Sequence, residues 1–328
     1  MRTIGGILNM RKIIIIFLAV ALVVMAAPSF GQTFTKRGTV GLKFLDIGVG
    51  GRALAMGEAY TAIANDASAI FWNPAGIGNI KNGDVFAGYS KWPADINLYS
   101  FAAAKRYELP YFGTSSLGLA GTLLNTGLMN RTTEFDQDGE VSGTFPYEDY
   151  WFGLSYAKYL TDRFCFGATV KYVHEQIDDF KVNSWAVDIG SYYETGFKTI
   201  RIGLAILNFG PDVHFKVPNA KAVPLPLTFR GGIAMDVLQN DISKATLVAE
   251  LAHPPDNNER YQFGGEYWLK EMIAIRAGYK LNMDEGGFTA GAGFKWPFTS
   301  SASFSVDYAY NDWGRLKAVH RVSTSLSF

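Results

Sequence analysis

The chain has 328 residues and no formal net charge, with 30 Lys and Arg side chains against 30 Asp and Glu. Because there is no basic excess, the composition argues against a nucleic-acid partner. Aromatic residues make up 15 % of the chain and glycines number 35, a profile that favours many strands and tight turns over a helical enzyme.

The N-terminus predicts a secretory signal peptide. Two basic residues precede the apolar run 13–25, and a stretch rich in small residues follows it. A basic start, an apolar stretch of about 7–15 residues and small residues at the cleavage site define such a signal. A membrane anchor is the alternative, but it needs roughly 20 apolar residues. We therefore expect residues 1–31 to be removed after Gly31 and the mature protein to be exported.

Two short helices are predicted ahead of the first strand. Residues 52–64 are rich in Ala and have a small apolar face. Asn65 and Asp66 can cap a second helical turn that runs through Phe71. The bulky Trp72 ends this apolar run.

The tetrapeptide Asn73-Pro74-Ala75-Gly76 separates these helices from the strands that follow. Pro74 excludes Asn73 from helical geometry, because the proline ring clashes with the preceding residue in that conformation. Gly76 allows the chain to reverse its direction. We expect the helical part of the chain to end here.

From Asp84 onward the sequence alternates apolar and polar residues with a period of two, which predicts strands. Most of them are close to the 9–11 residues that a tilted membrane-spanning strand needs. About fourteen strands are expected, at residues 84–91, 96–104, 115–124, 149–158, 164–175, 183–193, 199–208, 225–237, 243–252, 260–268, 272–280, 287–296, 301–310 and 318–328.

A soluble β-sandwich is the alternative architecture, because its strands also alternate. Sandwich strands usually have five or six residues, whereas these are longer, and an even number closes a sheet without edges. Alternate connections such as 159–163 and 269–271 are short, while 125–148 and 209–224 are long. Short periplasmic turns and longer outer loops are typical of outer-membrane barrels. We predict an all-β membrane protein, an antiparallel outer-membrane β-barrel of about fourteen strands over residues 84–328, surrounded by outer-membrane lipid.

Charged residues indicate which face of the predicted strands points to lipid. An Arg or Lys at the bilayer midplane costs about 2–4 kcal/mol, so the charged face is expected to line the lumen. Positive and negative residues fall on neighbouring strands, so they can pack the interior as pairs or, alternatively, line a selective path for a ligand. The predicted lumenal charges are Lys171, Asp188, Arg201, Arg230, Asp236, Glu250, Glu266, Arg276, Lys295, Asp307 and Arg321.

A barrel of this size needs something to fill it. About eight strands enclose a lumen that side chains fill, and 16–18 strands leave a water channel. We expect residues 32–83 to fold into the lumen as a plug, or hatch, rather than to hang in the periplasm. The candidate plug residues are Asp66, Trp72, Asn73, Pro74, Ala75 and Gly76.

Two segments resemble a known family. Residues 41–80, GLKFLDIGVGGRALAMGEAYTAIANDASAIFWNPAGIGNI, resemble the N-terminal signature of the PorV/PorQ family of outer-membrane proteins, and residues 223–234 resemble a second family segment. The tripeptide 73–75 is also similar to one in the N-terminal hatch of FadL-type fatty-acid channels, to whose fourteen-stranded fold the family belongs. The resemblance implies that this tripeptide lies in the plug.

The resemblance also implies a role in type IX secretion, which exports proteins that carry a C-terminal sorting domain and attaches many of them to the cell surface. Such secreted proteins and other secretion subunits are the expected partners. Loops 125–148 and 209–224 are the expected binding elements, with Phe135, Phe145 and Tyr147 as candidate contacts. The alternative is a FadL-like channel for long-chain fatty acids or other hydrophobic small molecules, in which the plug shifts to open a route.

The sequence carries no recognisable motif for catalysis or cofactor binding. The four histidines lie far apart and lack metal-ligand spacing, and no nucleophile elbow, phosphate loop or H-E-x-x-H motif occurs. Cys165, the one cysteine, excludes a disulfide framework and a Cys-based zinc site. Residues 136–140, DQDGE, lack the full twelve-residue calcium pattern and are expected in a solvated loop. We therefore expect no catalytic residue, cofactor or metal, and no enzymatic activity.

Overall fold

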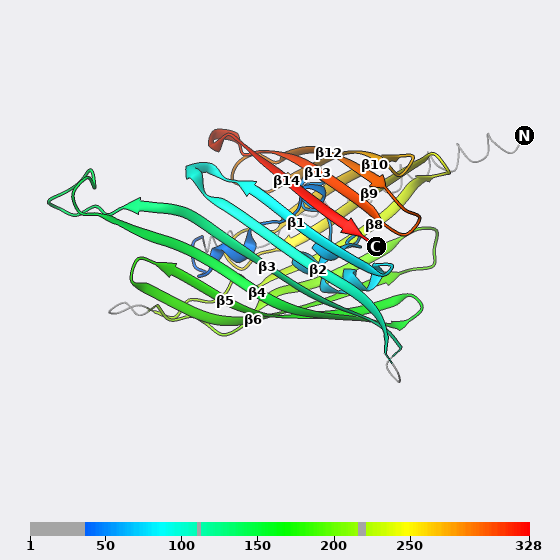
Figure 1. Ribbon diagram of the computed structural model, residues 1–328, viewed down its shortest axis with the longest axis horizontal. Coiled ribbons are helices and arrows are strands. Elements are labelled where there is room, and N and C mark those ends of the chain that lie inside the picture. The colour runs from blue at the N-terminus through cyan, green and yellow to red at the C-terminus, as the bar shows by residue number, and fades with distance from the viewer. Residues whose placement is uncertain (1–36, 110–112, 216–220) are drawn as a thin grey trace, which may run out of the picture.

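The computed structural model describes residues 37–109, 113–215 and 221–328, so the expected signal peptide lies outside the described residues. Its antiparallel strands form one closed barrel in chain order, with β1 paired to β14 (Figure 1). This confirms the predicted fold. The fourteen strands are β1 Gly83–Lys91, β2 Asn97–Leu109, β3 Gly113–Asn130, β4 Thr144–Thr161, β5 Phe164–Ile177, β6 Phe180–Glu194, β7 Arg201–Phe209, β8 Thr228–Gln239, β9 Ser243–His253, β10 Arg260–Leu269, β11 Ile273–Leu281, β12 Phe288–Pro297, β13 Ser303–Asp312 and β14 Ala318–Ser327.

The two faces of the barrel wall differ as the alternation predicts. In β11, Ile273 and Ile275 are exposed on the outside, whereas Ala274 and Arg276 are buried on the inside. In β4, Leu154 is 72 % exposed. Such a continuous exposed apolar surface would be unfavourable in water and suits a lipid environment.

Strand length differs around the barrel. β3 and β4 have 18 residues each, whereas β7 and β11 have 9. β3 pairs with β2 only as far as Asn125, and β6 pairs with β7 only from Val187. The remaining parts of these strands project beyond the other strands, at the left of Figure 1. We call residues 126–152 and 172–186 the β3–β6 extension.

The expected loop 125–148 is too long. β3 and β4 continue into it, so that only residues 131–143 connect them. A register shift between Asn125 and Leu128 interrupts the β3–β4 pairing. The extra residue lies in β3, so the bulge disrupts the period of two there and explains why the sequence pattern did not reveal the outer part of that strand.

Of the three residues expected in that loop, only Phe135 lies there, and it is 92 % exposed. Phe145 and Tyr147 lie in β4, so their assignment to a loop is wrong. Pro146 lies between them and cannot donate a hydrogen bond to a neighbouring strand. A proline in this position is typical of a loop, so the pattern did not indicate a strand here.

The second expected loop corresponds to the connection between β7 and β8, of which residues 210–215 and 221–227 are described. Val213 and Leu225 are buried in the core, and the backbone N–H of Gly41 donates to the carbonyl of Pro224 at 2.9 Å. The described part of this connection therefore packs on the N-terminal segment instead of standing free in solvent.

The N-terminal segment has less helix than expected. α2 covers only Gly51–Ala55, so the prediction of a helix over residues 52–64 is wrong in length. Gly57 and Glu58 both have a positive φ, which ends the helix. None of the helices in the described part of the chain has the length and apolar character needed to cross a membrane. The other helical elements are the 3₁₀ turns η1 Lys43–Asp46, η2 Ala67–Phe71, η3 Pro74–Asn79, η4 Pro93–Asp95 and η5 Gly314–Leu316.

Candidate functional site: the plug and the barrel lumen

Residues 41–80 run through the barrel, and we refer to them as the plug (Figure 1). α2 packs on β11–β14, η2 on β1–β3 and η3 on β2–β6. A short segment touches strands from opposite sides of a closed barrel only if it lies inside. Most plug side chains are buried, and together with the inward-facing wall residues they form the core.

Glycines on the inner face of the wall make room for the plug backbone. A Cβ at Gly203 of β7 would lie 2.3 Å from the carbonyl oxygen of Thr61, and one at Gly167 of β5 would lie 2.4 Å from the backbone nitrogen of Ala75. Neither contact is sterically allowed, so any larger residue would displace the plug. Five more wall glycines approach plug atoms in the same way, at Gly118, Gly190, Gly264, Gly278 and Gly291.

Arg52 of α2 forms the first polar contact between plug and wall. Its guanidinium donates to both carboxylate oxygens of Glu266 in β10, at 2.8 and 2.9 Å. Arg276 of β11 donates to Glu266 at 2.6 Å and to Asp307 of β13 at 2.6 Å. Two arginines and two carboxylates thus neutralise each other in the lumen, and one arginine belongs to the plug.

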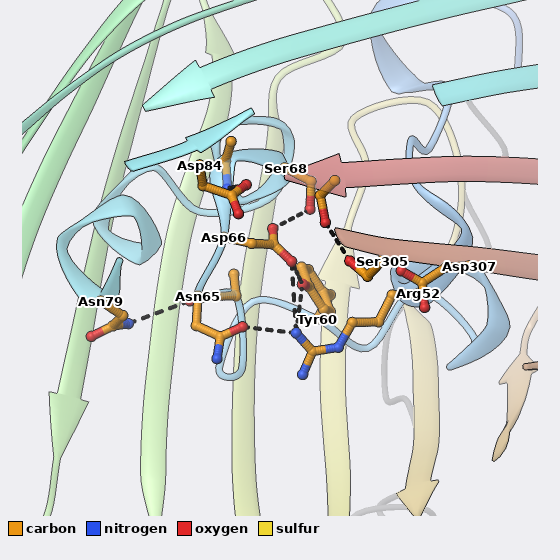
Figure 2. A network of polar contacts seen from close by, with 12 residues as sticks. Arg52, Tyr60, Asn65, Asp66, Ser68, Asn79, Asp84, Ser305 and Asp307 are labelled. Carbon is orange, nitrogen blue, oxygen red and sulfur yellow. Dashed lines mark hydrogen bonds and ion pairs between the residues drawn. The ribbon is translucent and has the colours of Figure 1, made fainter. Parts of the chain in front are cut away.

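Figure 2 shows how this network continues within the plug. Arg52 donates to the Asn65 side-chain oxygen at 2.7 Å, and the Tyr60 hydroxyl donates to Asp66 at 2.8 Å. Asp66 also accepts a hydrogen bond from the Ser68 hydroxyl. It precedes η2 but makes no side-chain cap bond, so the expected capping role is wrong. The side chain serves this tertiary network instead.

Glu250 of β9 forms a second contact with the plug. It accepts from the backbone N–H of Thr61 at 2.9 Å, from the Thr61 hydroxyl at 2.8 Å and from Arg230 of β8 at 2.7 Å. Arg230 also donates to the Glu58 carbonyl at 2.7 Å and lies 4.8 Å from the centre of the Trp72 ring. The buried ion pair of Arg230 and Glu250 therefore binds both the plug backbone and the Trp72 ring to the wall.

Glu58 in the plug pairs with Lys280 of β11 at 2.8 Å. Burial alone would raise the pKa of the Glu58 carboxyl, but the charges of Lys280 and Arg230 outweigh it and lower the pKa to about 2. Glu58 is therefore ionised at neutral pH and contributes to holding the plug in place.

The tripeptide that begins with Asn73 lies where the plug meets β5 and β6. The Asn73 amide donates to the carbonyls of Thr61 and Ser191 at 2.9 and 3.0 Å, and its oxygen accepts from the Ala75 N–H at 3.1 Å. Asn73 is extended, with φ −157° and ψ 102°, and Pro74 starts η3. One amide side chain therefore links two parts of the plug to the wall.

Gly76 does not reverse the chain, because it lies inside η3. A Cβ there would be 2.6 Å from the carbonyl oxygen of Ala64, so the glycine is required by close packing inside the plug. Trp72, the residue before Asn73, is buried and donates its ring N–H to the carbonyl of Val49 at 3.0 Å.

The other predicted lumenal charges lie on inner wall positions. Two pairs connect neighbouring strands, Lys171 of β5 with Asp188 of β6 and Arg201 of β7 with Asp236 of β8, each at 2.6 Å. Arg321 is buried and donates to Asn311 at 2.6 Å. Lys295 is half-buried and makes no ion pair with any residue that the structure describes.

Sequence reasoning missed the plug residues that make these contacts, chiefly Arg52, Glu58, Tyr60 and Thr61. Arg52 carried a usable signal, because a charged residue in a segment of small apolar residues destined for a lumen requires a carboxylate partner. Within the described ranges, no group of three or more His, Cys, Asp or Glu side chains is placed to hold a metal ion.

The family model described as "Type IX secretion system protein PorV" matches residues 32–254. The chain belongs to the PorV family. It is accordingly an outer-membrane β-barrel of type IX secretion, which confirms the predicted family and location. No curated protein sequence matches the chain.

Solved structures similar to this PorV-family barrel include two toluene transporters and a FadL homologue. The Ralstonia pickettii toluene transporter TbuX has 13 % identity and a TM-score of 0.55, and the match covers 85 % of this chain and 97 % of TbuX. A Pseudomonas aeruginosa FadL homologue has 11 % identity and a TM-score of 0.56, covering 86 % and 98 %. The Pseudomonas putida toluene transporter TodX has 11 % identity and a TM-score of 0.56, covering 84 % and 96 %. At these identities the similarity shows the fold alone.

Proposed function

We propose that this PorV-family barrel binds secreted proteins that carry a C-terminal sorting domain, together with other secretion subunits, at its outer rim while the plug stays in the lumen. The role is non-catalytic. The observation that carries this proposal is the occupied lumen, because the plug is buried and is bonded to the wall through Glu266, Glu250 and Ser191. Cargo that passed through the barrel would have to break these contacts.

The β3–β6 extension supplies the docking surface in this proposal. Leu128, Phe135 and Val141 are all largely exposed there, at 71 %, 92 % and 88 %. They lie at the outer end of the longest strands and in the loop that joins them, away from the apolar band around the barrel. Exposed apolar side chains in a polar loop are suited to partner binding.

The loop 131–143 at the tip of the extension is held in a defined shape. The Asp136 carboxylate accepts hydrogen bonds from the backbone N–H groups of 140–142, at 2.6–3.2 Å. Hydrogen bonds from Ser142 and Val141 lower the pKa of Asp136 to about 2, so the carboxylate is charged at neutral pH. A loop that is already ordered loses less entropy when a partner binds.

The test measures binding of a purified C-terminal sorting domain, from a protein secreted by the same cell, to the barrel in lipid nanodiscs. The variant Phe135→Ser/Val141→Ser is compared with Ile242→Ser/Phe298→Ser, which changes two exposed apolar residues in turns at the opposite rim. We expect the first to weaken binding about tenfold or more, as loss of central apolar contacts does, and the second to leave it unchanged. Equal affinities for both would overturn the proposed surface.

A further inference from the structure

A pocket of about 520 Å³ lies at the outer ends of β1 and β14. Two turns form it, residues 92–96 with η4 and residues 313–317 with η5, and they lie side by side in Figure 1. Its lining combines four basic side chains with apolar ones, at Lys91, Trp92, Pro93, Ala94, Arg315, Leu316, Lys317, Ala318 and His320. The plug and the β3–β6 extension contribute nothing to this lining.

The aromatic residues next to the pocket place it at the level of lipid headgroups. Tyr89 of β1 and Tyr99 of β2 are register partners on the outer face, with ring centres 5.4 Å apart. Tyr308 of β13 is also exposed on that face. Rings of outward-facing aromatic residues mark the membrane–water interface of such barrels. Lys91 and His320, which are directly opposite each other, are the next outward pair beyond this level.

The pocket carries positive charge that is available to a ligand. Lys91 pairs with Asp95 at 3.2 Å, and because both side chains are exposed this pair is weak. Arg315 donates to Glu285 through two guanidinium nitrogens, but the Arg315 side chain is itself 89 % exposed and can share its charge with a second anion. Lys317 is exposed and forms no ion pair with any residue that the structure describes. A phosphate group with two negative charges can compete for all three cations.

An apolar surface lies next to these cations. Leu316 is exposed into the pocket region and Trp92 lines it. Trp92 packs edge-on against Trp313, with ring centres 4.7 Å apart, which fixes its orientation. Cations beside a rigid apolar wall fit a molecule that carries phosphate next to sugar and acyl carbons.

We propose that this pocket binds the phosphorylated headgroup of a glycolipid in the outer leaflet. The phosphate lies among Lys91, Arg315 and Lys317, and the sugar ring and first acyl carbons lie against Trp92 and Leu316. The position at the lipid-facing rim selects a lipid over a soluble anion, because the acyl chains stay in the bilayer while basic side chains bind the headgroup. The site is independent of cargo binding.

The test uses the full barrel in detergent micelles and lipid A 1,4′-bisphosphate as the probe, with binding measured by native mass spectrometry. Lys91→Gln/Lys317→Gln removes two charges, and Lys198→Gln/Lys270→Gln removes two from exposed turns at the opposite rim. Lys317 has a positive φ, as both control positions do, so the control also covers the effect of substitution at such a backbone position. We expect the first variant to weaken binding about tenfold to thirtyfold and the second to have no effect.

Two further probes separate the sources of phosphate. Dephosphorylated lipid A should bind at least tenfold more weakly than the bisphosphate, and inorganic phosphate at equal concentration should not displace it. The proposal is overturned if the first variant binds lipid A as the unmodified protein does, if the dephosphorylated lipid binds equally well, or if inorganic phosphate displaces the lipid. A folding control is the heat-dependent mobility shift of the barrel on gels, which both variants should retain.

Discussion

The lumen and the β3–β6 extension use the same strands in opposite ways. In the lumen, Gly167 of β5 faces the plug backbone and Gly190 of β6 faces the Asn73 side chain, and neither position has space for a methyl group. Beyond the rim, the outer end of β3 and its loop expose Leu128 and Phe135 to solvent. The inner region is filled by the plug, whereas Leu128 and Phe135 at the tip of the outer region are exposed.

This difference separates the part of the protein that closes the lumen from the part that we propose to bind partners. The contact between plug and wall keeps the barrel lumen closed. In that contact, buried charges such as Glu266 and Arg276 compensate each other. Partner binding, as we propose it, belongs to the extension, where substitutions change little in the folded barrel. Changes inside should therefore affect stability, and changes at the tip should affect binding.

The largest effect is expected from Glu266→Ala. This change removes the carboxylate that Arg52 and Arg276 share, so that Arg276 keeps only Asp307 and the half-buried Arg52 keeps only Asp66. Removing one partner of a buried ion pair costs about 3–5 kcal/mol. Urea unfolding in lipid vesicles, followed by tryptophan fluorescence, measures the loss. The control Glu108→Ala removes an exposed carboxylate from β2 and should stay within about 0.5 kcal/mol. If both variants unfold at the same urea concentration, the ion network does not hold the plug.

A smaller loss of stability is expected from Gly167→Val. Overpacking lowers the free energy of unfolding by about 1–3 kcal/mol, and we expect a value near the upper end. The new side chain meets the backbone of Pro74 and Ala75, which cannot move without shifting η3. The plug should also become accessible to added protease. Gly265→Val is the matched control, because a Cβ there meets only Leu247, at 3.5 Å. A plug that stays protected in Gly167→Val would contradict the proposed fit.

Acidification should loosen both regions, for different reasons. The pKa of Glu58 is lowered to about 2 by Lys280 and Arg230 against the effect of burial, and that of Asp136 is lowered to about 2 by hydrogen bonds from Ser142. A lowered carboxyl pKa stabilises fully above the ordinary value of about 4, and the contribution is lost as the pH falls towards 2.

Hydrogen exchange of plug and loop amides between pH 5 and pH 2 separates these two effects. After correction for the intrinsic exchange rate at each pH, Glu58→Gln should reduce the pH dependence in the plug and leave that of the loop unchanged, and Asp136→Asn should do the reverse. If either variant abolished both, the two regions would be coupled, which this account does not expect.

The smallest effect on stability is expected from Phe135→Ser/Val141→Ser. Both side chains are largely exposed, so the free energy of unfolding should change by no more than about 0.5 kcal/mol, even though the affinity for a sorting domain falls. The same urea titration checks this. A loss of 2 kcal/mol or more would mean that the loop packs on the barrel and is part of its core.

The sequence predicted the wall well because each strand carries its own pattern. Ile273 and Arg276 lie on opposite faces as alternation requires, and the long outer connections were recognised from their length. The plug was predicted as a segment, but its details depend on tertiary contacts that no local pattern contains. Asp66 accepts a hydrogen bond from Tyr60 instead of capping η2, and Gly76 is required because the Ala64 carbonyl packs against it. The outer part of β4 was missed because Pro146 interrupts its pattern, and the outer part of β3 was missed because a bulge interrupts the alternation after Asn125.

The central claim is that the barrel works with its plug in place, and a disulfide crosslink tests it most directly. The Ala62 Cβ lies 3.5 Å from the position of a Cβ on Gly232, a separation suited to a disulfide. Ala62→Cys/Gly232→Cys, in a Cys165→Ser background, would fix the plug to β8. We predict that the oxidised variant binds the sorting domain and supports secretion as well as its reduced form does. Loss of secretion on oxidation, restored by reduction, would contradict the account and favour passage through the lumen.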